Sequence, residues 1–307
     1  MKYFLGVDGG QSGTTAVIGD ETGQVLGVGE AGPCNHAGAA EGRAKLERAV
    51  TASVSAACAA AKIDARTIRF AAACFGMSGG PDDKRNILAG ILRADQLTVT
   101  TDAEIALSGA TESGQGIIVI AGTGSIAYGR NDEGRAARAG GWGYVFGDEG
   151  GAFDIVRQAL RASLRMEEGW GPFTSLRGAL TEATGAASAN DVLHQFYTAE
   201  WPRSRAAALA PSVDQAADNG DLVALQIIHD AAMHLATLAG SVRGQLWLKR
   251  SAVEVAFIGG VFESRRLLER FRLLVELEEG VQCVAPVRGP AEGALREAIR
   301  SLRSRQR

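Results

Sequence analysis

The sequence predicts an α/β fold organised as two lobes. Chain length, alternating strand-like and helical segments, and a strand–turn–strand unit near the start of each half support this prediction. At 307 residues, the chain is longer than the roughly 250 to 300 residues at which one hydrophobic core stops growing. Its 46% hydrophobic and 22% charged residues supply enough apolar side chains for two cores.

The first half contains three strand-like runs separated by turns, followed by alternating helices and strands. Short apolar runs bounded by glycine-rich turns predict three antiparallel strands at the start of the chain. Apolar residues at helical spacing predict the helices that follow. The predicted strands are 3–7, 14–18, 25–28, 68–75 and 97–101, and the predicted helices are 42–62 and 83–92. This order completes one α/β lobe, assigned to residues 1–112.

The second half, residues 113–289, begins with the same strand–turn–strand pattern. Residues 117–121 and 126–129 flank a glycine-rich turn, and 153–248 is largely helical. The remaining predicted elements are a strand at 253–258, a helix at 264–277, a strand at 281–285 and a final helix at 290–302. No long linker separates the halves, so we expect the lobes to pack around a shared cleft.

Charge and composition argue for a small-molecule ligand. The net charge of -3, from 32 basic and 35 acidic residues, provides no field that would attract nucleic acid or an anionic membrane. Four scattered cysteines without metal-ligand spacing predict reduced thiols in the cytoplasm. We expect no secretory signal, and no apolar stretch near the roughly 20 residues that span a bilayer.

Two glycine-rich turns have the composition of phosphate-binding hairpins. The first comprises Asp8, Gly9, Gly10, Gln11, Ser12, Gly13, Thr14 and Thr15, and the second comprises Gly122, Thr123, Gly124 and Ser125. Their backbone N–H groups and hydroxyls suit phosphate oxygens, and Asp8 suits Mg²⁺ held through water. The alternative for the first turn is an ordinary hairpin with Asp8 bonded to its backbone. The presence of both turns favours two hairpins that hold one polyphosphate.

Two further positions lie at predicted strand ends. Gly259 and Gly260 would let adenine and ribose lie against backbone, or they could form a strand-to-helix turn that needs a positive φ. Asp102 follows the strand 97–101, where α/β sheets place reactive groups. Its carboxylate could accept a proton from an attacking sugar hydroxyl. The alternative is a helix N-cap, which the spacing by itself favours.

A glycine-flanked tryptophan and several loop residues are candidates for sugar contacts. Trp142 could stack on a sugar ring, and Asp148 or Glu149 could bond its hydroxyls. The alternatives are a core position for Trp142 and a helix start for Asp148. Asn35 and the run Ser78-Gly79-Gly80 could bond hydroxyl or acetamido groups, although each is also a common turn sequence.

Together these motifs resemble the N-acetylglucosamine kinase family, a BadF/BadG-like ATPase group within the actin-like ATPase superfamily. The resemblance implies two ribonuclease-H-like lobes, with the final helix, 290–307, joining the first. It implies Asp102 as catalytic base. It places Asn35, Ser78, Gly79, Trp142, Gly143 and Asp148 around the sugar, and assigns the two hairpins, with Gly259 and Gly260, to ATP and Mg²⁺. It also implies a homodimer whose lobes close on the sugar.

Two departures from the family pattern concern phosphate and sugar binding. The first hairpin usually carries a lysine where this chain has Gln11, Ser12 and Gly13 after Gly10. Some animal members have a tryptophan where this chain has Ala37, which leaves the choice of sugar open. Glucosamine and N-acetylmuramic acid are alternative acceptors. An activator ATPase of 2-hydroxyacyl-CoA dehydratases and a non-catalytic sugar sensor are the alternative functions.

Overall fold

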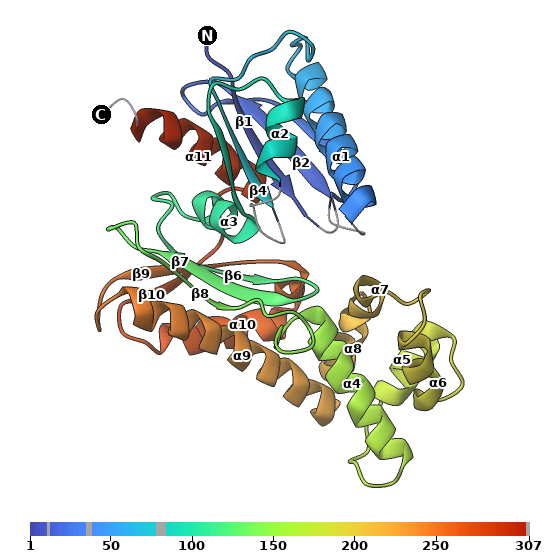
Figure 1. Cartoon of the computed structure of the whole chain (residues 1–307). Coiled ribbons are helices and arrows are strands. Elements are labelled where there is room, and N and C mark those ends of the chain that lie inside the picture. Colours follow the sequence, from blue (N-terminus) through green and yellow to red (C-terminus); the bar gives the residue numbers. More distant parts are fainter. Residues whose placement is uncertain (11–12, 35–38, 78–83, 305–307) are drawn as a thin grey trace. The chain divides into compact units, whose positions relative to one another are not determined.

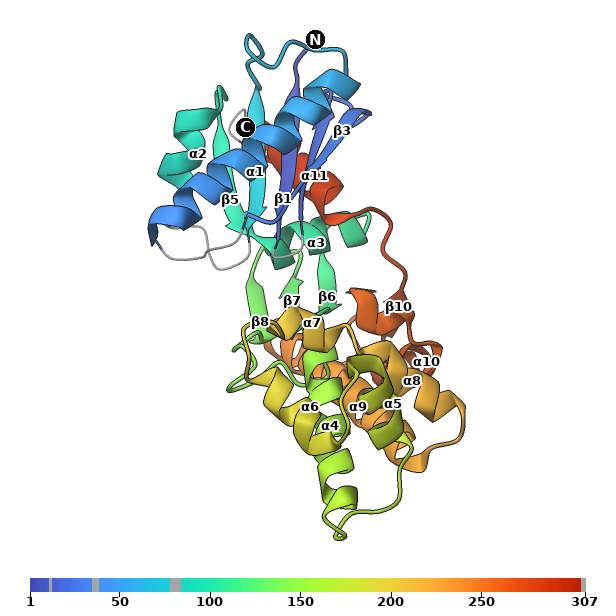
Figure 2. The same cartoon turned by 90° about the vertical axis from the view of Figure 1, so that its right-hand side faces the viewer.

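A computed structural model describes residues 1–10, 13–34, 39–77 and 84–304. The chain forms two compact units (Figures 1 and 2). Unit 1 contains Met1–Gly116 and Ala285–Arg307, and unit 2 contains Ile117–Val284. Each unit is built around its own five-stranded sheet, which confirms the predicted α/β class.

Unit 1 contains a mixed sheet of order β3-β2-β1-β4-β5. Its strands are β1 (Phe4–Gly9), β2 (Thr14–Gly19), β3 (Val25–Ala31), β4 (Ala72–Met77) and β5 (Leu97–Thr101). Its helices are α1 (Ala39–Ala60), α2 (Arg85–Ile91), α3 (Asp102–Ala110) and α11 (Pro290–Ser304). The first three strands are antiparallel, as predicted, and β4 and β5 run parallel to β1. The strand predicted at 68–75 begins later, at Ala72.

Helices cover both faces of this sheet because the side chains of a strand alternate between its two faces. Leu5 and Val7 of β1 belong to the same apolar cluster as Val50 of α1. Phe4 belongs to the opposite cluster, with Leu295 of α11. Both views show α1 and α11 on opposite sides of the sheet (Figures 1 and 2). Unit 1 is therefore a three-layer sandwich whose last helix comes from the far end of the chain.

Close packing of α11 on β1 depends on a glycine in the strand. A Cβ atom on Gly6 would lie 2.1 Å from the backbone nitrogen of Leu295 and 2.4 Å from the carbonyl oxygen of Ala291. Backbone atoms of a packed helix cannot give way as a flexible side chain can. Gly6 therefore sets the distance between β1 and α11.

We expect Gly6→Ala to destabilise the protein by about 3 kcal/mol, at the upper end of ordinary overpacking costs. The added methyl must displace α11 from the sheet. The matched control is Gly90→Ala in α2, where an added Cβ meets nothing within 4 Å and helix propensity favours alanine. Thermal unfolding should show a lowered midpoint for Gly6→Ala and an equal or raised one for Gly90→Ala. Equal midpoints for Gly6→Ala and the wild type would contradict the packing argument.

Unit 2 contains a sheet of order β10-β9-β6-β7-β8. Its strands are β6 (Gly116–Ala121), β7 (Ser125–Arg130), β8 (Ala136–Gly140), β9 (Val253–Ile258) and β10 (Val281–Val284). Its helices are α4 (Ala152–Glu167), α5 (Leu176–Thr184), α6 (Ala189–Phe196), α7 (Arg203–Ala207), α8 (Ala210–Asp218), α9 (Leu222–Leu246) and α10 (Arg265–Glu276), with a 3-10 turn at Gly260–Glu263. Strands β6, β9 and β10 are parallel, and β8 pairs antiparallel with β7.

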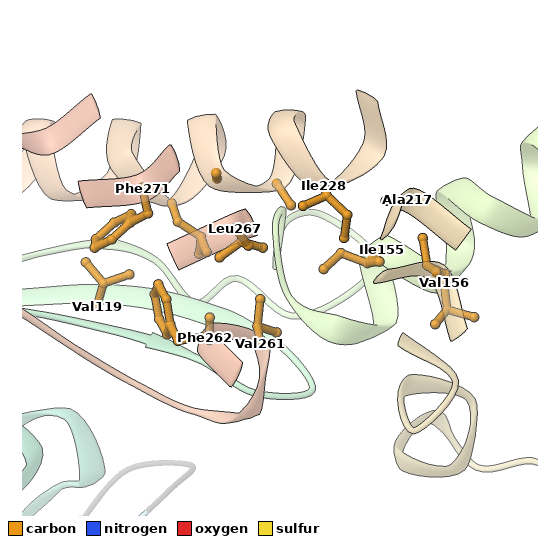
Figure 3. Packing of buried hydrophobic residues seen from close by; sticks show 14 of the residues in the cluster. Val119, Ile155, Val156, Ala217, Ile228, Val261, Phe262, Leu267 and Phe271 are labelled. Carbon is orange, nitrogen blue, oxygen red and sulfur yellow. The ribbon is translucent and has the colours of Figure 1, made fainter. Parts of the chain in front are cut away.

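One apolar cluster joins the sheet of unit 2 to its helices (Figure 3). Val119 of β6 packs in this cluster with Phe262 of the 3-10 turn and Phe271 of α10. Ile155 of α4 and Ile228 of α9 approach each other in the same cluster. These contacts hold the carboxyl ends of β6 and β9 beside the start of α4.

Helix α9 corrects one expectation from the sequence. Its length and composition are sufficient to cross a membrane, so the expectation that no apolar stretch approaches this length is wrong. Ala224, Ile228, Ala231 and Leu235 form a buried face at helical spacing within the unit 2 cluster. Packing within unit 2 accounts for the apolar residues of this face.

Candidate functional site

In unit 1, two carboxylates lie at the carboxyl ends of parallel strands. Gly9 of β1 pairs with Met77 of β4, and Met77 pairs with Thr101 of β5. Asp8 and Asp102 therefore lie at the same edge of the sheet, on strands whose backbones are about 10 Å apart. Parallel α/β sheets commonly bind ligands at this edge.

The start of α3 decides between the two interpretations of Asp102. Thr101 is the N-cap, and its hydroxyl accepts from the backbone N–H of Glu104 at 3.2 Å. Asp102 is the first helical residue, and its carboxylate accepts from the N–H of Ala103 at 2.9 Å. The N-cap interpretation of Asp102 is therefore wrong. The carboxylate of Asp102 is thus a hydrogen-bond acceptor at the end of β5, and the positive end of the α3 dipole stabilises its negative charge.

Burial and charge shift the ionisation of both carboxylates. Burial, followed by the negative charge of Asp102, raises the pKa of Asp8 from 3.8 to about 6. Burial also raises the pKa of Asp102, while backbone hydrogen bonding at Ala103 and the charge of Lys84 act in the opposite direction. A bound cation would offset the unfavourable free energy of two buried negative charges. Carboxylates in this situation are expected at a site that binds Mg²⁺ or receives a proton.

Lys84 is a site residue that the sequence did not reveal. It immediately precedes α2, and its side chain is only 1% exposed. Its positive charge acts on both Asp102 and the thiol of Cys34. The sequence indicated only a position within the helix 83–92, because burial of a lysine leaves no local signal. A buried lysine that faces a carboxylate balances part of the negative charge there.

The first glycine turn is closed by backbone contacts. The N–H of Gly10 donates to the oxygen of Gly13 at 2.9 Å. A Cβ on Gly9 would lie 2.5 Å from the sulfur of Met77 and 2.8 Å from that of Cys34. Thr14 is buried, and its hydroxyl donates to the oxygen of Gly32 at 2.9 Å. Six predicted site residues lie outside the described residues: Gln11, Ser12, Asn35, Ser78, Gly79 and Gly80.

The second glycine turn, between β6 and β7, is bonded to the start of α4. The N–H groups of Ala152 and Phe153 donate to the carbonyl oxygens of Gly122 and Thr123, at 2.8 and 3.2 Å. The Ser125 hydroxyl donates to the oxygen of Glu149 at 2.7 Å. These contacts fix the turn at the N-terminus of α4.

A pocket of about 510 Å³ opens beside this turn. Its lining includes Gly122, Thr123, Ser204, Asp214, Gly260 and Ser264. The pocket thus brings together the second turn, assigned to phosphate, and Gly260, assigned to adenosine. Gly259 has a φ of +115°, and a Cβ there would lie 2.3 Å from the oxygen of Ala121. The expected need for a positive φ is confirmed, and the pocket volume is within the range of small-molecule sites.

The sugar candidates of unit 2 lie on one loop. Trp142 is 69% exposed, so a core position for it is wrong. Gly143 has a φ of +82° and Asp148 a φ of +64°. Helix α4 is N-capped by Gly151, so Asp148 does not begin that helix. The loop is held by Arg157, whose guanidinium donates to the oxygen of Tyr144 at 3.0 Å.

Comparison with known proteins identifies the family. Residues 5–298 match the BadF/BadG/BcrA/BcrD ATPase family. The chain belongs to this family. Membership of the BadF/BadG/BcrA/BcrD ATPase family makes ATP the nucleotide of the chain.

Three similar proteins span almost the whole chain. An N-acetylmuramic acid/N-acetylglucosamine kinase of Clostridium acetobutylicum is 33% identical over 90% of this chain and 91% of its own length. An N-acetyl-D-glucosamine kinase of Dictyostelium discoideum is 30% identical over 87% and 88%. A solved structure from Chromobacterium violaceum, provisionally described as an N-acetylglucosamine kinase, has a TM-score of 0.77 and 27% identity, covering 96% of this chain and 98% of that one.

Proposed function

We propose that this member of the BadF/BadG/BcrA/BcrD ATPase family transfers the γ-phosphoryl group of ATP to the 6-hydroxyl of an amino sugar. N-acetylglucosamine is the leading acceptor. The names of the two relatives at 33% and 30% identity support an amino sugar as substrate class. The observation that carries the proposal is the carboxylate of Asp102 at the end of β5, which does not serve as a helix cap.

In this proposal Asp102 acts as the general base. A sugar hydroxyl attacks phosphorus well only as its proton leaves, and a carboxylate within hydrogen-bond reach can accept that proton. Burial raises the pKa of Asp102, which strengthens the carboxylate as a base. The charge of Lys84 helps to keep this carboxylate ionised.

The nucleotide is assigned to unit 2, with its adenosine in the 510 Å³ pocket near Gly259 and Gly260. The second turn, Gly122 to Ser125, would contact its phosphates. Gly9, Gly10, Gln11, Ser12 and Thr14 of the first turn are proposed as the phosphate contacts of unit 1. In this proposal unit 1 supplies the base Asp102, and unit 2 supplies the adenosine pocket.

Mg²⁺ is proposed as the metal that accompanies ATP, with Asp8 as its protein contact. Mg²⁺ typically binds one or two carboxylates together with phosphate oxygens and water. The carboxylate of Asp8 fits this chemistry, because burial and Asp102 make its negative charge unfavourable without a cation. Bound Mg²⁺ would supply charge neutralisation at the phosphates.

The sugar is assigned to Trp142, Gly143 and Asp148 of unit 2, and to Asn35, Ser78 and Gly79, which lie outside the described residues. The exposed face of Trp142 supports stacking on a pyranose ring. N-acetylmuramic acid is a second candidate acceptor, because the Clostridium relative carries both sugars in its name.

The deciding experiment measures ADP release with N-acetylglucosamine, N-acetylmuramic acid, glucosamine and glucose, followed by mass spectrometry of the product. We expect sugar-dependent ADP release and a phosphorylated N-acetylglucosamine. Sugar binding without ADP release would instead favour a sensor. ATP hydrolysis without a phosphorylated sugar would favour the activator alternative.

A homodimer in the cytoplasm is proposed from the family resemblance. The four cysteines are free, and three of them are buried in unit 1: Cys34, Cys58 and Cys74. Buried free thiols suit a reducing compartment. Sedimentation equilibrium checks the oligomer, since a mass near twice 32.0 kDa is the expected result.

A further inference from the structure

Arg203, which no sequence motif includes, precedes Ser204 of the unit 2 pocket in the chain. Nη1 of Arg203 is 3.6 Å from Oδ2 of Asp148. Its guanidinium carbon is 5.2 Å from the ring centroid of Tyr144. The side chain of Arg203 is 28% exposed. A carboxylate and an aromatic ring therefore orient a guanidinium that remains accessible from solvent.

The carboxylate that contacts Arg203 also lies against the second glycine turn. A Cβ on Gly124 would be 2.4 Å from Oδ2 of Asp148 and 2.6 Å from its Cγ. A side chain at position 124 would force this carboxylate to move. Oδ2 of Asp148 thus lies next to the turn on one side and near Arg203 on the other.

The backbone of Asp148 supports a positioned carboxylate. Its φ is +64°, and the residue is 7% exposed. A non-glycine residue in this region is uncommon and costs about 1 kcal/mol or more, and such residues cluster at ligand sites. The N–H of Gly151 donates to the oxygen of Asp148 at 3.0 Å, which ties this conformation to the start of α4.

The chain position of Arg203 relates it to the nucleotide pocket. Arg203 is the first residue of α7, and Ser204 and Ala207 of the same helix line the pocket together with Gly122 and Thr123. The Oδ2 atom of Asp148 that lies 3.6 Å from Nη1 of Arg203 also lies against Gly124 of the second glycine turn. That turn is the phosphate end of the pocket in the proposed function.

We infer that Arg203 binds the polyphosphate of the nucleotide in unit 2, and that Asp148 is the positioning residue that orients it. A guanidinium has five N–H donors, so it can contact a carboxylate and a phosphate at the same time. Arginine–phosphate contacts are charge-assisted and often bidentate. The inference rests on the proposed nucleotide pocket, and it gives Asp148 a role toward ATP besides the sugar role implied by resemblance.

The test is calorimetric binding of ATP and adenosine to the full chain in the presence of Mg²⁺ and without sugar. For Arg203→Met we expect ATP affinity to fall by about 10- to 100-fold, the range of a lost charge-assisted contact. Adenosine affinity should change by less than about 2-fold, because adenosine has no phosphate to contact. Arg203→Lys should recover part of the ATP affinity, since it restores the charge without the planar fork.

The matched control is Arg205→Met on the same helix. The guanidinium of Arg205 lies 4.1 Å from the ring centroid of Trp201 and donates to the oxygen of Glu200. Its removal should leave both affinities unchanged. Asp148→Asn removes the charge that orients Arg203, so ATP affinity should fall by a smaller factor than in Arg203→Met, again without loss of adenosine binding.

The outcomes separate the inference from the proposed function. Equal ATP affinity in the wild type and Arg203→Met, or parallel losses of ATP and adenosine binding, would overturn the inference alone. A wild type that binds no ATP would overturn the proposed function and the inference with it. A loss of affinity for ATP but not for adenosine in Arg203→Met, partly recovered in Arg203→Lys, supports the inference and the proposed function.

Discussion

Replacing Asp102 by asparagine is expected to lower kcat by about 10²- to 10⁴-fold, the usual contribution of a general base. Asparagine keeps the shape of aspartate and an oxygen that can accept from the N–H of Ala103. It cannot accept the proton of the sugar hydroxyl. The Kd of the sugar should therefore change little, and steady-state ADP release together with sugar titration measures both quantities.

Glu104→Gln is the matched control for this variant. Glu104 lies two residues further along α3, and its carboxylate accepts from the hydroxyl of Thr100. Its loss should lower kcat by only a few fold. A similar loss in both variants would show that charge near the start of α3, rather than one base, is required.

The pH profile carries a second signature of Asp102. Burial raises its pKa above the ordinary 3.8, and the protonated acid cannot act as a base. The kcat of the wild type should therefore fall as the pH decreases through this raised pKa. Because Asp8 and Asp102 interact, the acid limb reports apparent values of the pair. A kcat that stays constant down to pH 4 would contradict the assignment.

Replacing Asp8 by asparagine should have two opposite effects. Turnover should fall by about 100-fold or more, because the proposed Mg²⁺ contact is lost. The ligand-free protein should become more stable at neutral pH, because burial and Asp102 raise the pKa of Asp8 from 3.8 to about 6. This shift corresponds to a cost of up to about 3 kcal/mol for the ionised form.

The size of this stability change depends on pH. The folded state holds the proton of Asp8 up to about pH 6, whereas the unfolded state releases it near 3.8. The folded wild type therefore loses stability as the pH rises from about 4 to 6, and the cost is complete above that window. Thermal unfolding in the presence of a chelator should show Asp8→Asn above the wild type at pH 7.5 and level with it near pH 4.

Asp20→Asn is the control in unit 1, because its expected change in stability at neutral pH is opposite to that of Asp8→Asn. Hydrogen bonding from the side chain and backbone of Thr22 and from Gln24 lowers the pKa of Asp20. An amide there should lower the stability at neutral pH, because the favoured carboxylate is lost. Stabilisation by both asparagine variants would indicate a general effect of reduced negative charge and not the burial of Asp8.

Local patterns predicted most elements because they depend on near neighbours in the sequence. The strands predicted at 97–101 and 253–258 have the same bounds in the structure. Strand β8 was missed, since its residues Ala136–Gly140 have little strand propensity and no apolar alternation. Its conformation comes from pairing with β7. This pairing begins with Ile126 opposite Gly140 and ends with Arg130 opposite Ala136.

The sequence by itself determined where the glycine turns and the strand-end aspartates fall, because turns and periodic patterns depend on residues that are close together in the chain. Tertiary structure alone decided that Thr101, not Asp102, caps α3, and that Lys84 is buried where its charge acts on Asp102. It alone also brought Arg203 to Asp148, 55 positions away in the printed sequence. Burial and ion pairing arise between distant segments once both are packed, so no local pattern can encode them.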